Sequence, residues 1–269
     1  MDIKRELSLF YNITLISFKD ALIYRFSFFC RLIFLVCPII SSYFLWKIIY
    51  ANRKEINDYS FQNIVVYMIL STIIYNLLQA EDVMVNEQIR SGELNGFLIK
   101  PVSFLKYIFY KLIGNKCVYL IINIIPVLII FFICNYFNVL SVTPTSYNFI
   151  VFIFIIIAAL FLNFMIDVII GLLAFWFGRV SFIFIIKDIC FWIFAGVLFP
   201  LDFLPKYIKK IVFLLPFKFL GYYPTSLLLN KIQFSIFDLL NLLSWMIILF
   251  VTIWLLWKKG IKKYDGFGW

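Results

Sequence analysis

Histidine is absent from this sequence of 269 residues, and charged residues make up only 14% of it. Histidine is the commonest general base and metal ligand in proteins, so its absence argues against hydrolytic or metal-dependent chemistry in this chain. Soluble domains are about one quarter charged and about half apolar. Here 64% of the residues are hydrophobic and the mean hydropathy is +1.01, which indicates a protein whose solvent is lipid.

Cysteine is scarce, and glycine-rich phosphate loops are missing. The cysteines are odd in number and unclustered, which indicates neither a disulfide framework nor a zinc site; they are Cys30, Cys37, Cys117, Cys134 and Cys190. The ten glycines are dispersed, and no G-x-x-x-x-G-K-[ST] string occurs. The chain therefore lacks the phosphate loop with which many proteins bind ATP, and we expect no catalytic residue, metal or cofactor in it.

The apolar residues are arranged in long blocks that predict an all-α integral membrane protein. A bilayer-spanning helix needs about 20 mainly apolar residues. Six blocks satisfy this length: Phe26–Ile49, Phe61–Ala80, Ile108–Tyr136, Phe149–Phe177, Val180–Leu201 and Leu239–Trp257. The run Leu7–Phe18 is too short to cross and is flanked by charges, so residues 1–25 are predicted to form a cytosolic, interfacial helix before a six-span domain over residues 26–269.

Lysine and arginine predict the orientation of these spans. Positive residues in short loops are retained on the cytosolic side of a membrane. If the N-terminus is cytosolic, 16 of the 24 basic residues fall on the inner side and 8 on the outer side. The sequence therefore predicts a multi-pass protein of the cell (inner or plasma) membrane with both termini in the cytosol. The basic residues lie at the ends of apolar blocks and form no stripe, so no nucleic-acid partner is expected.

The segment Asp202–Gln233, between the fifth and sixth spans, is long and apolar. Prolines and a glycine divide it into pieces that are too short to cross the membrane: Pro205, Pro216, Gly221 and Pro224. Irregular backbone at membrane depth must be covered by protein or face water. We therefore expect re-entrant or interfacial helices that pack against the bundle and cap its outer face.

The most polar segment, Glu81–Tyr107, joins the second and third spans. Residues 81–94 favour a helix, with Glu87 three residues before Arg90, while Gly92, Gly96 and Pro101 end it. A solvated loop is one interpretation. The other is a coupling helix that docks onto a cytosolic motor, with Glu81, Glu87, Arg90, Gly92 and Glu93 as candidate contact residues.

Asp167 is the one acid well inside an apolar span, where a charged side chain costs about 3 kcal/mol or more. A role in substrate binding or gating is one interpretation. A protonated carboxyl bonded to Asn163, or a position nearer the inner surface, is the alternative. Lys187 and Asp188 lie in the next span, where each needs another partner or a position at the inner surface, and we expect Lys187 to snorkel to the interface. Gly171 and Gly178 could admit a close helix approach, although they lack G-x-x-x-G spacing.

Several strings together resemble the permease subunits of ABC-2-type exporters. Ile89–Leu94 followed by Leu98–Val102 is similar to that family's "I-R-x-G-x-L … L-x-K-P" element. The outer "G-x-x-F-P-L-x-x-L-P … L-P-F … P" signature is matched in order and spacing by Gly196, Phe199, Pro200, Leu201, Leu204, Pro205, Leu215, Pro216, Phe217 and Pro224. The end of the chain, Gly260–Tyr264, resembles the family's short basic tail after the sixth span.

The resemblance implies a non-catalytic subunit of a transport ATPase complex. Such a permease forms a dimer, with a second copy or a paralogous permease, and couples to two cytosolic ABC ATPase subunits that bind ATP and Mg²⁺. It exports a cargo, and the many aromatic residues suit a drug, a peptide or a lipid-like molecule. Two other functions also fit the composition: a membrane scaffold or assembly factor without transport of its own, and an ion-coupled secondary transporter.

Overall fold

A computed structural model describes residues 3–23, 25–79, 84–99, 103–116 and 144–264, and its architecture is almost entirely helical. The longer helices are α1 (Ile3–Ile23), α2 (Arg25–Ile49), α3 (Phe61–Leu78), a helix over residues 104–116, α7 (Ser146–Leu172), α9 (Ser181–Phe194) and α12 (Ile236–Lys263). The shorter elements are α4 (Met84–Arg90), α5 (Leu94–Leu98), α8 (Ala174–Phe177), η1 (Leu201–Phe203), α10 (Lys206–Leu214), η2 (Pro216–Leu220) and α11 (Tyr222–Leu228). A small antiparallel hairpin joins β1 (Glu55–Ile56) to β2 (Tyr59–Ser60).

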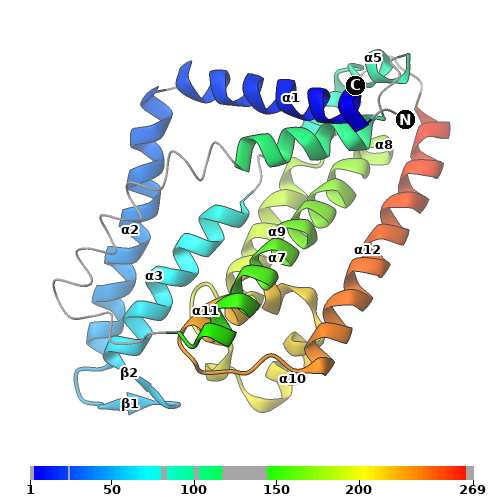
Figure 1. Cartoon of the computed structure of the whole chain (residues 1–269). Helices are drawn as coiled ribbons and strands as arrows, with labels where there is room; N and C mark the ends of the chain where they lie inside the picture. The colour runs from blue at the N-terminus through cyan, green and yellow to red at the C-terminus, as the bar shows by residue number, and fades with distance from the viewer. Residues whose placement is uncertain (1–2, 24, 80–83, 100–102, 117–143, 265–269) are drawn as a thin grey trace.

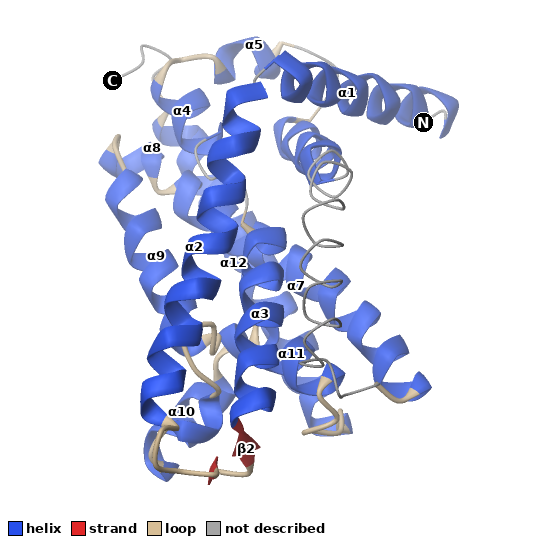
Figure 2. Cartoon of the chain, turned by 90° about the vertical axis from the view of Figure 1, so that its left-hand side faces the viewer, coloured by secondary structure: helices blue, strands red, loops and turns tan. Residues whose placement is uncertain are grey.

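The long helices α2, α3, α7, α9 and α12 run side by side and form a bundle (Figure 1). α2 packs along α3, and α12 packs along α7. α1 lies across one end of the bundle, together with α4, α5 and the end of α12; we call this the α4 end (Figures 1 and 2). The hairpin, α10 and α11 lie at the opposite end, which we call the α10 end.

Side-chain caps fix where the helices of the bundle begin. Ser60 and Thr145 accept hydrogen bonds from backbone amides in the first turns of α3 and α7, at 3.3 Å in both helices. Ser235 and Asp238 form a reciprocal capping box at the start of α12. These caps satisfy amides that have no partner within the helix. All three lie at the α10 end, so this end has well-defined helix starts.

Three described helical segments are long and apolar enough to cross a membrane: Phe61–Leu78, Ser146–Phe177 and Ile236–Lys263. Two shorter apolar helical stretches, Leu7–Ile16 and Val36–Ile49, lie in α1 and α2. Most of the predicted span Ile108–Tyr136 falls outside the described residues. The helical architecture and these segments agree with the predicted class, an all-α membrane protein.

Helix α9 ends at Phe194, before the predicted boundary at Leu201. Gly196 follows with a φ of +75°, a conformation that a helix cannot continue. The chain then turns through Pro200 into the short helix η1. The apolar run therefore continues beyond the helix, which is why hydropathy placed the boundary too late.

Two apolar cores lie one above the other in the bundle. The first includes Ile74 and Leu78 of α3, Ala159 and Leu162 of α7, and Phe219 of η2. The second lies at the α4 end and is built from α4, α5, α7, α8, α9, α12 and the helix over residues 104–116. On α7 the buried residues of the first core reach Leu162 and those of the second begin at Val168. Between them Asn163 and Asp167 are buried, while Met165 and Ile166 pack against both cores.

Candidate coupling and gating site

Helix α4, the predicted coupling helix, is held against the bundle by an apolar face. Its Val85 and Ile89 are buried in the core at the α4 end. Gly171 of α7 permits this contact, because a Cβ built there would lie 2.6 Å from Cβ of Val85. Real Cβ contacts are never that short, so only glycine at position 171 lets α4 approach α7 so closely. This is the close helix approach that Gly171 was expected to allow, and its partner is α4.

The other face of α4 and the turn after it carry the candidate contact residues. Glu87 and Glu93 are exposed and Arg90 is half-buried. Gly92 has a φ of +79° and forms the turn between α4 and α5, a conformation that favours glycine. Glu81 lies outside the described residues. The structure therefore brings together charged side chains of α4 and the turn that follows, on a helix whose other face is anchored to α7.

Asp167 is buried in an ion pair with Lys187. Nζ of Lys187 lies 2.8 Å from Oδ1 of Asp167, and the two side chains are 4% and 8% exposed. Nζ of Lys187 also lies 3.3 Å from Oδ1 of Asp188. The prediction that Lys187 snorkels to the interface is therefore wrong. α9 is rotated so that this lysine faces α7, where the carboxylate compensates its charge.

Amide side chains connect this ion pair to the end of α3. Asn163 donates one hydrogen bond to Asp167, at 3.0 Å, and another to the carbonyl of Leu78, at 2.8 Å. Gln79, which ends α3, makes a longer contact of 3.4 Å with Oδ1 of Asp188. The bond to Asn163 was expected for a protonated Asp167 carboxyl, whereas here the same carboxyl group also pairs with Lys187. We call Asn163, Asp167, Lys187, Asp188 and Gln79 the polar layer.

Lys116 strengthens the same junction from the helix over residues 104–116. Its Nζ donates to the carbonyl of Leu77, at 2.7 Å, and also to the carbonyl of Gln79. The last carbonyls of a helix have no partner within it and carry partial negative charge, so a buried ammonium there is stabilised. The polar layer thus joins α3, α7 and α9 between the two apolar cores, at the point where α3 leads into the α4 segment.

Gly196, a candidate residue of the outer signature, anchors the segment after α9. Its carbonyl accepts a hydrogen bond from the Tyr67 hydroxyl of α3, at 2.6 Å. The neighbouring carbonyl of Ala195 accepts from the backbone amide of Tyr222, at 2.6 Å. A Cβ on Gly196 would lie 2.9 Å from the Tyr67 oxygen and 3.2 Å from Cβ of Tyr222. The turn therefore requires glycine for both its conformation and its close contacts.

Gly196→Ala is accordingly expected to destabilise the protein by about 1–3 kcal/mol, because it combines a left-handed φ with overpacking. The measurement is thermal unfolding in detergent. Gly96→Ala is the matched control, since nothing lies within 4 Å of a Cβ at Gly96. Equal melting temperatures for the two variants would contradict the importance of this turn.

Asp202 organises the rest of the α10 end. It accepts hydrogen bonds from the hydroxyls of Tyr59 and Tyr222, both at 2.9 Å, and pairs with Lys209 at 2.7 Å. Burial, followed by the nearby Asp202 charge, raises the pKa of Tyr59 well above its usual value, so this phenol stays a donor. The network ties the hairpin, η1, α10 and α11 together.

The prolines of the outer signature occupy helix starts. Pro200 immediately precedes η1, Pro205 precedes α10, and Pro216 is the first residue of η2. Proline suits these positions because its missing amide would have no helical partner there. Pro224 differs from the prediction: it lies in the first turn of α11 and does not divide two pieces.

The sequence strings did not identify Asp202, Lys187, Gln79 or Lys116 as parts of these networks.

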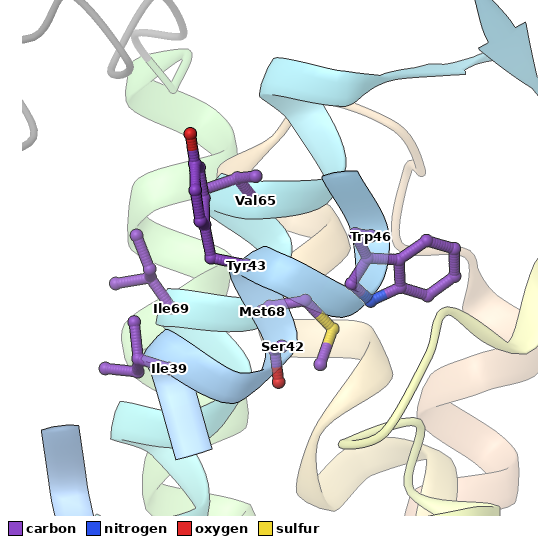
Figure 3. Close-up of a pocket in the computed structure, with 7 residues that line it drawn as sticks. All are labelled: Ile39, Ser42, Tyr43, Trp46, Val65, Met68 and Ile69. Carbon is purple, nitrogen blue, oxygen red and sulfur yellow. The ribbon is translucent and has the colours of Figure 1, made fainter. Parts of the chain in front are cut away.

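A small apolar pocket lies between α2 and α3 (Figure 3). Ile39, Tyr43 and Trp46 of α2 face Val65, Met68 and Ile69 of α3, with Ser42 as the polar member. The cavity has a volume of about 10 Å³, about the space of one water molecule. Sites for drug-sized ligands usually measure ~300–1,000 Å³. This pocket is therefore too small to enclose such a cargo.

Comparison with protein families matches residues 36–268 to a family described as "ABC-2 family transporter protein". A search of curated proteins found no match. The matched range includes most of α2 and all the later elements of the bundle, so it covers the polar layer, α4 and the α10 end together. The resemblance seen in the sequence is confirmed. The chain therefore belongs to the ABC-2 transporter family and is a multi-pass membrane permease of ABC-type transport.

Proposed function

We propose that this permease is the transmembrane subunit of an ATP-driven exporter, with six spans and both termini in the cytosol. The six spans would be α2, α3, the segment around residues 108–136, α7 with α8, α9 together with the apolar segment up to Leu201, and α12. Helix α9 alone has 14 residues, so the segment after it would complete the crossing. The arrangement of the helices supports an even number of crossings, because α1 and the end of α12 lie at the same end of the bundle. Lys258, Lys259, Lys262 and Lys263 end α12 there, as expected of a cytosolic end.

The observation that carries the proposal is the contact of α4 with α7 at Gly171. Gly171 lies one helical turn from Asp167, so a displacement of α4 acts on the helix that holds the polar layer. Interiors this closely packed transmit displacement rather than absorb it. Association with ABC ATPases is general in the family, and α4 offers them charged side chains at the α4 end. ATP and Mg²⁺ would bind to those ATPase subunits.

The segment 202–233 would form the outer cap. η2 and α11 are mostly buried and contact α3 and α7, so this segment is wedged into the bundle as a re-entrant element would be. The cargo path would lie between two permeases, as the resemblance implies, and the pocket between α2 and α3 in the described part of the chain is too small for a drug, a peptide or a lipid-like molecule. A second copy or a paralogous permease would complete the path.

Purification in mild detergent tests the coupling surface directly. We expect an ATPase subunit to copurify with the wild-type permease. It should be lost from the variant Glu87→Lys/Arg90→Glu, because reversed charges at a docking surface repel a partner that they formerly attracted. Copurification is measured by mass spectrometry of the eluted complex, at matched amounts of permease.

Arg53→Glu/Glu55→Lys is the matched control. It reverses the same pair of charge types on exposed residues of the hairpin region at the α10 end, and should leave copurification unchanged. If no ATPase copurifies with the wild type, the proposed exporter is wrong. If both variants lose the ATPase equally, the coupling surface is not on α4.

A further inference from the structure

Helix α10 has an apolar stripe that faces away from the protein. Tyr207, Ile211 and Leu214 are 86%, 63% and 67% exposed. They follow an i, i+4, i+7 pattern, so they lie along one side of the helix. Val212 is buried on the opposite side, where Lys209 pairs with Asp202. The helix thus has apolar groups on both its inward and its outward side.

Two lysines flank the outward stripe. Lys206 and Lys210 are both exposed, four residues apart, and therefore lie next to each other on the helix surface. Within the described part of the chain, neither makes an ion pair, whereas Lys209 between them does. The surface thus combines an apolar stripe with two free positive charges along one edge.

Hydrogen bonds at both ends of α10 fix its depth relative to the bundle. Near its start, Lys209 is bonded through Asp202 to Tyr59 of the hairpin. At its end, the carbonyl of Leu214 accepts a hydrogen bond of 2.7 Å from Nε1 of Trp245 of α12. The helix therefore runs from the level of the hairpin to the level of Trp245.

The apolar length of α12 places the level of Trp245 inside the hydrocarbon region, below its boundary. A span needs about 20 residues, and counting back this number from Trp257, just before Lys258, reaches about Asp238. Trp245 lies on the membrane side of Asp238, and the carbonyl of Leu214 accepts a hydrogen bond from Trp245. The exposed end of α10 is consequently at the depth of the acyl chains, and its lysine-bearing start is at the depth of the headgroups.

We propose that α10 binds the surface of an anionic phospholipid bilayer, with Ile211 and Leu214 among the acyl chains, Tyr207 at the boundary, and Lys206 and Lys210 on the lipid phosphates. Charge favours lipid over a second copy, because α10 carries no acidic residue that could pair with the lysines of another copy, whereas anionic lipid supplies a phosphate. Basic residues beside an apolar helix face are the usual composition of interfacial helices. The inference rests on the membrane topology of the proposed function but not on ATP-driven transport.

Native mass spectrometry of the detergent-purified permease measures the lipid contact. Titration with phosphatidylglycerol and with phosphatidylcholine gives the ratio of the two affinities. Lys206→Gln/Lys210→Gln is expected to lower this ratio about 30-fold, which corresponds to about 1 kcal/mol per lysine near an anionic surface. Arg53→Gln/Lys54→Gln removes two exposed charges from the same end of the molecule and should change the ratio much less. Equal losses in the two variants would overturn the proposal.

A spin label at Ile211, in a variant without the native cysteines, distinguishes the possible occupants in vesicles containing phosphatidylglycerol. Collision with oxygen in preference to a water-soluble nickel complex is the result expected for acyl chains. Preferential collision with the nickel complex would mean that water covers the stripe. Dipolar broadening between two labels would mean that a second copy covers it. Either of these outcomes overturns the proposal. Neither assay involves an ATPase, so their failure is separate from failure of the proposed exporter.

Discussion

Asp167→Ala is expected to destabilise the permease by about 3–5 kcal/mol, because it leaves a buried lysine without its carboxylate. The side chain of Lys187 is only 4% exposed, and Asp167 is its closer acidic partner at 2.8 Å. Asp188 lies at 3.3 Å and is more exposed, so it retains part of the compensation. We therefore expect a loss toward the lower end of this range, measured as the fall in thermal unfolding temperature in detergent.

Asp167→Leu/Lys187→Met is the control that identifies the cause. Replacement of a buried ion pair by apolar residues of similar volume is often neutral or stabilising. The double variant should therefore unfold close to the wild type, well above Asp167→Ala. If the double variant is as unstable as Asp167→Ala, the loss comes from packing and not from an uncompensated charge.

The same double variant tests gating. If it is stable and the reconstituted complex transports normally, the ion pair serves only the fold. If it is stable but transport is lost, the polar layer has the gating role proposed for Asp167. A direct role of Asp167 in proton-coupled transport is disfavoured by the pairing itself, because protonation of the carboxylate would weaken the 2.8 Å pair with Lys187, which is closer than the 3.3 Å pair of Lys187 with Asp188.

The sequence predicted part of the polar layer for a clear physical reason. Asp167 stands out as an acid in an apolar span, and Asn163 lies one turn away on the same helix, so their hydrogen bond follows from helical periodicity. Lys187 lies on another helix. Its partner depends on how α7 and α9 are rotated about their axes, and hydropathy contains no information on that rotation.

Other parts of the site could not be predicted because they depend on contacts between distant segments. Apart from Pro224, the prolines and Gly221 correctly indicated where the segment after α9 breaks, since these residues affect the backbone locally. The role of Asp202 became visible only when the hairpin, α10 and α11 met around it. Likewise, nothing in the spacing of Gly171 and Gly178 indicated that Val85 would occupy the space beside Gly171.

Gly171→Leu is expected to abolish most of the coupling between ATP hydrolysis and transport. Any side chain at this position must displace α4, because a Cβ alone would lie 2.6 Å from Cβ and 2.7 Å from Cγ1 of Val85. Overpacking of this kind costs about 1–3 kcal/mol. If the docked position of α4 is destabilised by this free energy, transport falls about tenfold or more. ATP hydrolysis by the ATPase subunits should fall less than transport, since their catalytic residues are untouched. Both rates are measured on the reconstituted complex, after thermal unfolding has shown that the variant is folded.

A compensating change in α4 shows whether the space beside Gly171 is what matters. Val85→Gly removes both of the atoms that a side chain at position 171 would meet, so Gly171→Ala/Val85→Gly should transport better than Gly171→Ala alone, despite the cost of about 1 kcal/mol for glycine within a helix. Gly96→Ala introduces the same methyl group on α5, where nothing lies within 4 Å, and should leave transport unchanged. Normal coupling in Gly171→Leu would contradict the role of this contact, because a helix that tolerates such displacement cannot transmit a smaller one from the motor to α7.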